Sequence, residues 1–103
     1  MKISVIIPAF NEKATIREIL RRVQAMKLAE EIIVVDDGST DGTCEILQEL
    51  DHQGPVRVVF HEKNQGKGAA VRTGIQQAQG DVLIIQDADL EYDPREYPNL
   101  LCP

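Results

Sequence analysis

The sequence has few cysteines, no long apolar run and fewer basic than acidic residues. Cys44 and Cys102 do not have the spacing of a zinc site and no secretory leader precedes them, so a reducing, cytoplasmic compartment is expected. The apolar opening at residues 3–7 is much shorter than the roughly 20 residues of a membrane-spanning helix. The formal net charge of −6 would repel a polyanion, which argues against a nucleic-acid partner.

The composition is that of an ordinary globular protein, with 43% hydrophobic and 27% charged residues. A chain of 103 residues is long enough to bury one hydrophobic core and too short for two. No internal repeat, linker or low-complexity segment divides it. Residues 1–103 are therefore expected to form a single domain.

Apolar patterns typical of strands alternate along the chain with patterns typical of helices. Short aliphatic runs predict strands at residues 4–7, 32–35, 56–60 and 82–85, the first ending at Pro8. Apolar residues at three- and four-residue steps predict helices at residues 14–28, around 46–50, at 69–78 and, more briefly, at 98–101. With right-handed crossovers, this order gives an α/β fold, a Rossmann-like parallel sheet with flanking helices.

Two of the predicted helices carry further signals. Thr15 and Glu18 fit a capping box at the start of the first helix, with Asn11 as the alternative cap. The helix at residues 69–78 is expected to turn a face of mostly small residues toward the sheet, which permits close approach. That face comprises Ala70, Val71, Gly74, Ile75 and Ala78.

Acidic side chains follow the strand predicted at residues 82–85. Four consecutive aliphatic residues favour a central strand covered on both faces, and Asp87, Asp89 and Glu91 then fall where the chain leaves the sheet. Such a concentration of negative charge requires either water or a cation. Asp87 and Asp89 are spaced to ligate one Mg²⁺ or Mn²⁺, and Glu91 is a candidate third ligand or a solvated glutamate.

Polar stretches also follow the other three strands, at residues 8–12, 36–39 and 61–68. Ligands of parallel α/β sheets bind outside the carboxyl ends of the strands, so these stretches predict one binding edge. One of Asp36 and Asp37 is expected to form the turn and cap the next helix, and the other to accept hydrogen bonds from a nucleobase.

Further side chains are candidates for the same edge. Asn11 and Glu12 could close the pocket, although helix capping explains Asn11 equally well. Lys67 and Arg72 are the cations nearest the edge, and the helix that begins near Gly66 presents a positive end to an anion. A solvated lysine is the alternative for Lys67.

Two competing motifs are weaker. Residues 66–71 resemble a dinucleotide-binding fingerprint, but Val71 takes the place of the third small residue and the loop follows the third strand instead of the first. The acidic pattern also resembles that of phosphatases with an aspartyl nucleophile, which carry it after the first strand. The fingerprint leaves Asp89 without a role.

Four segments together resemble the amino-terminal half of family 2 glycosyltransferases with the GT-A fold, most closely the dolichol-phosphate and polyprenyl-phosphate branch. The resemblance covers essentially the whole chain, and its motifs match in order and spacing. They lie at residues 5–12, 33–43, 64–68 and 87–91.

The resemblance implies a site and a reaction. The nucleotide-sugar pocket would be lined by Pro8, Phe10, Glu12, Val35, Asp37, Ala88 and Asp89. Asp87 and Asp89, with Glu91 as a further candidate, would hold Mg²⁺ or Mn²⁺. The implied activity is that of a metal-dependent, inverting glycosyltransferase that moves a hexosyl group from a UDP- or GDP-linked sugar to an acceptor, a polyprenyl phosphate lipid.

Relatives in this family continue well past this length, so residues 1–103 are expected to be a truncated domain whose acceptor site and catalytic residues lie beyond Pro103. The alternative is a catalytically inactive nucleotide-binding module or fragment. A truncated sheet is expected to expose apolar surface and to self-associate. The full-length protein is expected in the cytoplasm or at the cytoplasmic face of a membrane, where its lipid acceptor would lie.

Overall fold

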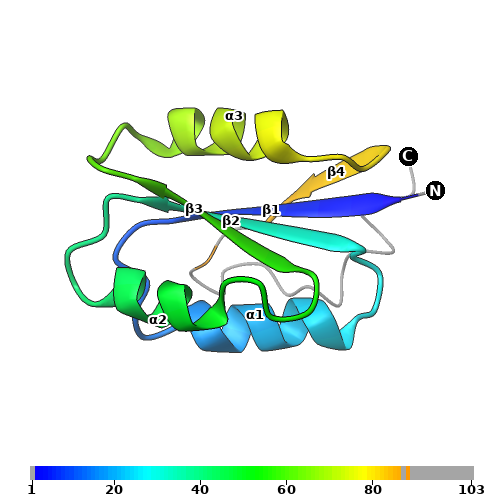
Figure 1. Ribbon diagram of the computed structural model, residues 1–103, viewed down its shortest axis with the longest axis horizontal. Helices are drawn as coiled ribbons and strands as arrows, with labels where there is room; N and C mark the ends of the chain where they lie inside the picture. The colour runs from blue at the N-terminus through cyan, green and yellow to red at the C-terminus, as the bar shows by residue number, and fades with distance from the viewer. Residues whose placement is uncertain (1, 87, 89–103) are drawn as a thin grey trace.

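The computed structural model describes residues 2–86 and 88, and its strands form a parallel sheet between two layers of helices (Figure 1). The strand order is β3-β2-β1-β4, and each neighbouring pair is parallel. The predicted α/β architecture is confirmed, while the helix predicted at residues 98–101 lies outside the described residues. In chain order the elements are β1 (Ile3–Ala9), α1 (Ile16–Ala25), β2 (Glu31–Asp37), α2 (Thr43–Leu50), β3 (Val56–His61), α3 (Lys67–Gln77) and β4 (Val82–Ile85).

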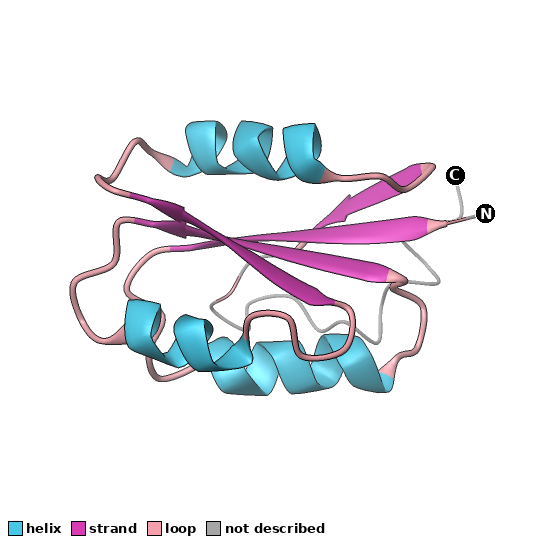
Figure 2. Cartoon of the chain, in the orientation of Figure 1, coloured by secondary structure: helices cyan, strands magenta, loops and turns pink. Residues whose placement is uncertain are grey.

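Helices α1 and α2 cover one face of the sheet, and α3 covers the other (Figure 2). Strands β1 and β2 lie at the centre and are buried along their whole length. Alternate side chains of β1 serve the two faces: Val5 and Ile7 join the core cluster of α1, whereas Ile6 lies against Gly74 of α3. None of the described helices is long and apolar enough to cross a bilayer.

The prediction that residues 82–85 form a central strand is wrong. Among the described strands β4 is at the edge of the sheet, paired with β1 alone. Ile84 faces the core of α1, but Leu83 and Ile85 on the other face are 40% and 44% exposed. The four aliphatic residues therefore form a strand that is covered on one face only.

Pro8 does not end the first strand as predicted, because β1 continues to Ala9. Ile6 accepts a hydrogen bond from the Gln86 amide, so alternate residues of β1 face β4. Pro8 faces the same side, two residues beyond the last paired residues, Ile6 and Ile85. Its missing amide proton therefore costs no hydrogen bond between the strands.

The helices differ from the predictions at their ends and on one face. Helix α1 is shorter than residues 14–28. Thr15 occupies the N-cap position, as predicted, but its side chain makes no capping bond, so the capping box is wrong. In α3, Ala70 and Gly74 are buried against the sheet as predicted. Ile75, which was predicted on the same face, is instead 43% exposed.

Candidate functional site

A cavity of about 290 Å³ opens at the carboxyl ends of β1 and β2, beside the amino end of α3. This is the edge of the sheet where the polar loops were predicted to meet. The cavity is lined by the ends of β1 and β2, the loops after β1 and between β3 and α3, the first turn of α3, and the chain after β4. Its lining residues are Pro8, Ala9, Phe10, Glu12, Asp37, Asn64, Gly66, Lys67, Ala70 and Ala88.

The predicted pocket residues fall into three groups. Five line the cavity: Pro8, Phe10, Glu12, Asp37 and Ala88. Val35 does not, because it is fully buried and packs in the core with Ile33 and Ala70. Asp89 lies outside the described residues, as do Asp87 and Glu91.

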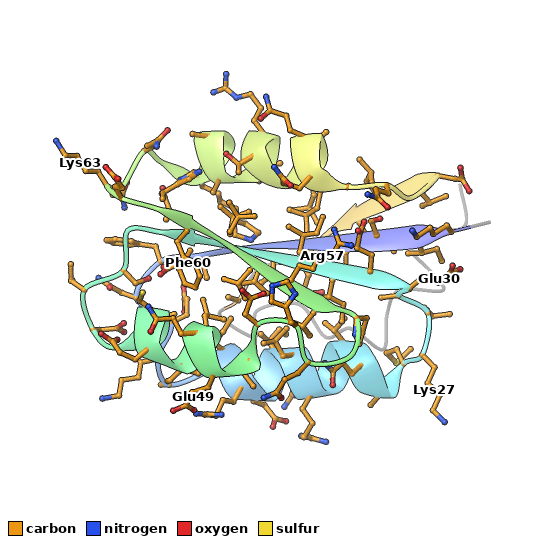
Figure 3. The ribbon with its side chains drawn as sticks, in the orientation of Figure 1. Lys27, Glu30, Glu49, Arg57, Phe60 and Lys63 are labelled. Carbon is orange, nitrogen blue, oxygen red and sulfur yellow. The ribbon has the colours of Figure 1, made fainter. Side chains whose placement is uncertain are left out.

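Of the two cations predicted to lie near the binding edge, one lines the cavity and the other does not. Lys67 lines the cavity, while Arg72 lies on the exposed surface of α3 and does not. Lys63, in the loop before α3, points away from the molecule (Figure 3). Lys67 is thus the cation that the described structure places at the cavity.

Asp37, the last residue of β2, is a buried carboxylate that holds the neighbouring loop. Its Oδ1 accepts hydrogen bonds from the Gln65 amide (2.8 Å) and the His61 ring (2.9 Å), and its Oδ2 accepts one from the Gly66 amide (3.0 Å). Burial alone would raise the pKa of Asp37, but these three donors outweigh burial and lower it. Asp37 is therefore an ionised carboxylate that shapes the cavity wall.

Asp36 has the turn-forming role that was expected of one of the two aspartates, but neither aspartate caps α2, whose N-cap is Gly42. Its Oδ1 accepts a hydrogen bond from the Ser39 amide at 3.2 Å. Gly38 completes the turn with a φ of 74°, and a β-carbon there would overlap the backbone of Lys63 and Asn64. The glycine thus lets the turn after β2 lie directly against the loop before α3.

The loop after β1 is joined to the loop after β2 by side chains that accept hydrogen bonds from backbone amides. Asn11 has a φ of 53° and, instead of capping α1, its Oδ1 accepts a hydrogen bond from the Thr40 amide at 2.7 Å. The Glu12 amide donates to Thr43 Oγ1 (2.9 Å), and the Lys13 amide donates to Asp41 Oδ2 (3.2 Å). These contacts hold Glu12 at the cavity.

Thr15 connects α1 to the chain that follows β4. Its hydroxyl lies 2.5 Å from the Ala88 carbonyl and 3.3 Å from Glu12 Oε2. Gln86 and Ala88 are both buried, so the chain is anchored where it leaves the sheet. The predicted acidic ligands flank this anchored segment in sequence.

No group of three acidic, histidine or cysteine side chains able to hold a metal ion occurs among residues 2–86 and 88. The predicted ligands Asp87, Asp89 and Glu91 lie outside those residues.

Sequence reasoning gave no individual role to three residues of the site, Asp41, Thr43 and His61, although they lie in the segments 33–43 and 61–68 that it assigned to the binding edge or to the family motifs. Asp41 and Thr43 form a local turn, in which Asp41 Oδ1 accepts a hydrogen bond from the Thr43 amide at 3.0 Å, and this spacing is a recognisable signal. His61 had no such local signal, since its partner Asp37 is distant in the sequence.

An open cavity outside the carboxyl ends of a parallel sheet is the arrangement of α/β domains that bind small ligands. The model of glycosyl transferase family 2 matches residues 4–102, and the chain belongs to that family. Its sheet and flanking helices are those of the amino-terminal part of the GT-A fold.

Individual relatives agree with this assignment. The dolichol-phosphate mannosyltransferase of Pyrococcus furiosus is 43% identical over 98% of this chain and 29% of its own length. The structure of S. aureus TarS in complex with UDP-GlcNAc has a TM-score of 0.80, with 29% identity over 97% of this chain and 30% of that one. The mannosyltransferase PcManGT of Pyrobaculum calidifontis, in complex with GDP-Man and Mn²⁺, has a TM-score of 0.77, with 31% identity over 85% of this chain and 27% of that one.

The chain thus spans about three tenths of the length of the curated relatives it matches.

Proposed function

We propose that this chain forms the donor half of a metal-dependent, inverting glycosyltransferase that moves a hexosyl group from a UDP- or GDP-linked sugar to a polyprenyl phosphate. One observation carries the proposal. Five of the residues that the family resemblance assigns to the nucleotide pocket line a single cavity at the carboxyl ends of the strands. They come from three separate segments of the chain: the end of β1 with the loop after it, the end of β2, and the chain after β4.

The chain's own groups would bind the donor in the following way. Phe10, which is 42% exposed at the cavity, offers a ring face to a nucleobase. The amino end of α3 carries the positive end of the helix dipole, and Lys67 adds a cation, so this wall suits the diphosphate. Asp37 would act chiefly by fixing the wall, since three donors already occupy its carboxylate.

Asp87 and Asp89, with Glu91 as a further candidate, would hold Mg²⁺ or Mn²⁺ next to Ala88. When bound, such an ion neutralises the charge that grows on the departing diphosphate. A relative of this chain is shown with GDP-Man and Mn²⁺ together, which supports the pairing of metal and nucleotide sugar.

The lipid acceptor is supported by the relatives named for dolichol phosphate and undecaprenyl phosphate. A lipid phosphate is already an anionic nucleophile, so it needs no strong base, whereas a hydroxyl acceptor would need one. Such an acceptor places the reaction at a membrane surface, and we propose the cytoplasmic face.

The test is calorimetric titration of UDP and GDP into the protein with and without Mn²⁺, repeated with Asp89→Ala. We expect binding that Mn²⁺ strengthens by about tenfold and that the variant loses, because removing a charged ligand weakens the metal contact to the diphosphate. Binding that ignores both the metal and the variant would remove the metal from the proposal.

A catalytically inactive nucleotide-binding module is the second candidate, since the cavity accounts for nucleotide binding and does not by itself account for sugar transfer. The two candidates differ in one measurement, the transfer of labelled sugar from UDP- or GDP-linked donors to a polyprenyl phosphate in detergent. The module would be favoured if both this chain and a longer form that includes it bound the nucleotide but neither transferred the sugar.

A further inference from the structure

A buried series of hydrogen bonds connects the cavity wall to the side of α3. The His61 ring lies with Nδ1 at 2.9 Å from Asp37 Oδ1 and Nε2 at 2.8 Å from Thr73 Oγ1. The side chains of His61 and Asp37 are only 9% and 4% exposed. The Thr73 hydroxyl is also 3.1 Å from the Ala69 carbonyl, one turn earlier in α3.

The chemistry of these groups fixes the donor at one end. An ionised Asp37 can only accept, so the proton must lie on His61 Nδ1. At the other end the Thr73 hydroxyl can donate to Nε2, or it can donate to the Ala69 carbonyl and accept from a protonated Nε2. The bond to Asp37 is kept in both cases, so the histidine is a stable link between β2 and α3.

The link bears directly on the cavity. Asp37 receives the Gln65 and Gly66 amides on the same carboxylate that His61 contacts. Asn64 and Gly66, which line the cavity, belong to that loop, and Lys67, which also lines it, follows as the first residue of α3. Without His61, the Asp37 carboxylate would lose a donor that restrains its rotation. The loop whose amides donate to that carboxylate would then lose its fixed position.

We propose that His61 is a positioning residue for nucleotide binding. Held by Thr73, it orients the Asp37 carboxylate so that residues 64–67 keep the shape of the cavity wall. The ligand class is the nucleoside diphosphate of the proposed function, on which this inference rests.

The test uses two pairs of variants. His61→Leu removes both hydrogen bonds, while His61→Asn keeps a donor near the position of Nδ1. Thr73→Val removes the hydroxyl at nearly constant shape, while Thr73→Ser restores it. The control is His52→Asn, at the other histidine, which is 82% exposed and remote from the cavity lining. Each protein is titrated with UDP and GDP, its Gln65 and Gly66 amide exchange is measured by NMR without nucleotide, and its unfolding is followed in urea.

We expect His61→Leu to weaken nucleotide affinity by about tenfold and to speed exchange of both amides, as losing a hydrogen bond to a charged group predicts. Thr73→Val should weaken affinity by about threefold, with Thr73→Ser close to the unsubstituted protein. His61→Asn keeps a donor to Asp37 but loses the bond to Thr73, so it should weaken affinity by about as much as Thr73→Val and by less than His61→Leu. A merely structural role would change unfolding in both pairs without this pattern of rescue. If His61→Leu does not fold, the Thr73 pair and His61→Asn decide the question.

Unchanged affinity and unchanged amide exchange in His61→Leu and Thr73→Val would overturn the proposal. Equal losses in Thr73→Val and Thr73→Ser would also overturn it, since the hydroxyl would then not be the cause. If neither nucleotide binds the unsubstituted protein, the proposed function fails, and the exchange rates alone decide whether His61 positions the wall.

Discussion

Glu31 is a buried carboxylate at the start of β2, at the end of the strand away from the cavity, and its hydrogen bonds join three segments of the chain. Its Oε1 accepts hydrogen bonds from Ser4 Oγ (2.8 Å) on β1 and from the Gln79 amide (2.9 Å) before β4. Ser4 Oγ in turn accepts a bond from the Gly80 amide at 3.0 Å. Burial alone would raise the pKa of Glu31, but the Gln79 and Ser4 donors, together with the charges of Lys2 and Arg57, outweigh burial and lower it.

Replacing Glu31 by Gln should lower the free energy of unfolding at pH 7 by about 1–3 kcal/mol, because two hydrogen bonds to a buried charged acceptor become weaker bonds to a neutral one. The pKa of Glu31 in the folded state lies below its unfolded value of about 4.3, so its stabilising contribution is present at pH 7. That contribution disappears as the pH falls through the folded pKa. Urea unfolding from pH 7 to pH 3 should therefore show the two proteins converge in acid.

Glu30→Gln is the matched control, since Glu30 is exposed and its side chain points into solvent beside β2 (Figure 3). It should change the free energy of unfolding by less than about 0.5 kcal/mol at any of these pH values. A Glu31→Gln protein as stable as this control at pH 7 would contradict the role given to Glu31.

The site residues show what a sequence can reveal at this scale. One of Asp36 and Asp37 could be assigned to the cavity because the pair ends an apolar strand, a pattern that is local in the chain, and the family resemblance singled out Asp37. The residues that bond to Asp37, namely Gln65 and Gly66, could not be predicted, because they lie in the loop between β3 and α3, far from Asp37 in the sequence. The same holds for His61, whose role depends on a register that pairs it with Asp37.

At the scale of elements, α3 lies close to the sheet because of one glycine. A β-carbon at Gly74 would overlap the side chain of Ile6 at the centre of β1. Gly74→Ala should therefore lower the free energy of unfolding by about 1–3 kcal/mol, the usual cost of overfilling a packed core. Urea unfolding monitored by circular dichroism measures it.

The same helix supplies the matched control. Gly68 lies in the first turn of α3, and a β-carbon there meets no atom within 4 Å. Gly68→Ala should raise stability by about 0.5–1 kcal/mol, because alanine has the higher helix propensity. Equal effects of the two substitutions would show that helix propensity, and not contact with Ile6, decides the tolerance for alanine.

Strands β2 and β4 show the limit of pattern reading for elements. Residues 32–35 and 82–85 have the same aliphatic character, and only the first run is buried on both faces. The type of element was predicted in both cases because it depends on the local sequence. Whether a strand is buried on both faces depends on which elements pair with it and cover it, which a local pattern does not reveal. Here α3 contacts β1 and β2 but leaves one face of β4 uncovered.

At the scale of the whole molecule, apolar side chains are exposed on the α3 side of the sheet near β4. Leu83 and Ile85 lie on the uncovered face of this edge strand, and Ile75 is exposed on α3. An edge strand with exposed aliphatic residues is a site for pairing with another chain. We therefore propose that the chain self-associates through this face, against the repulsion of its net charge of −6.

Sedimentation velocity over a hundredfold range of concentration should show a rising average mass, and Leu83→Lys should abolish the rise. A lysine at position 83 places a charge on the exposed face of β4, and association through that face would have to bury this charge. Gln24→Lys adds the same charge at an exposed position of α1, on the other face of the sheet, and should leave the association unchanged. If both variants dissociate alike, net charge governs the association; if the unsubstituted chain is a monomer throughout, the face near β4 does not pair with a second copy.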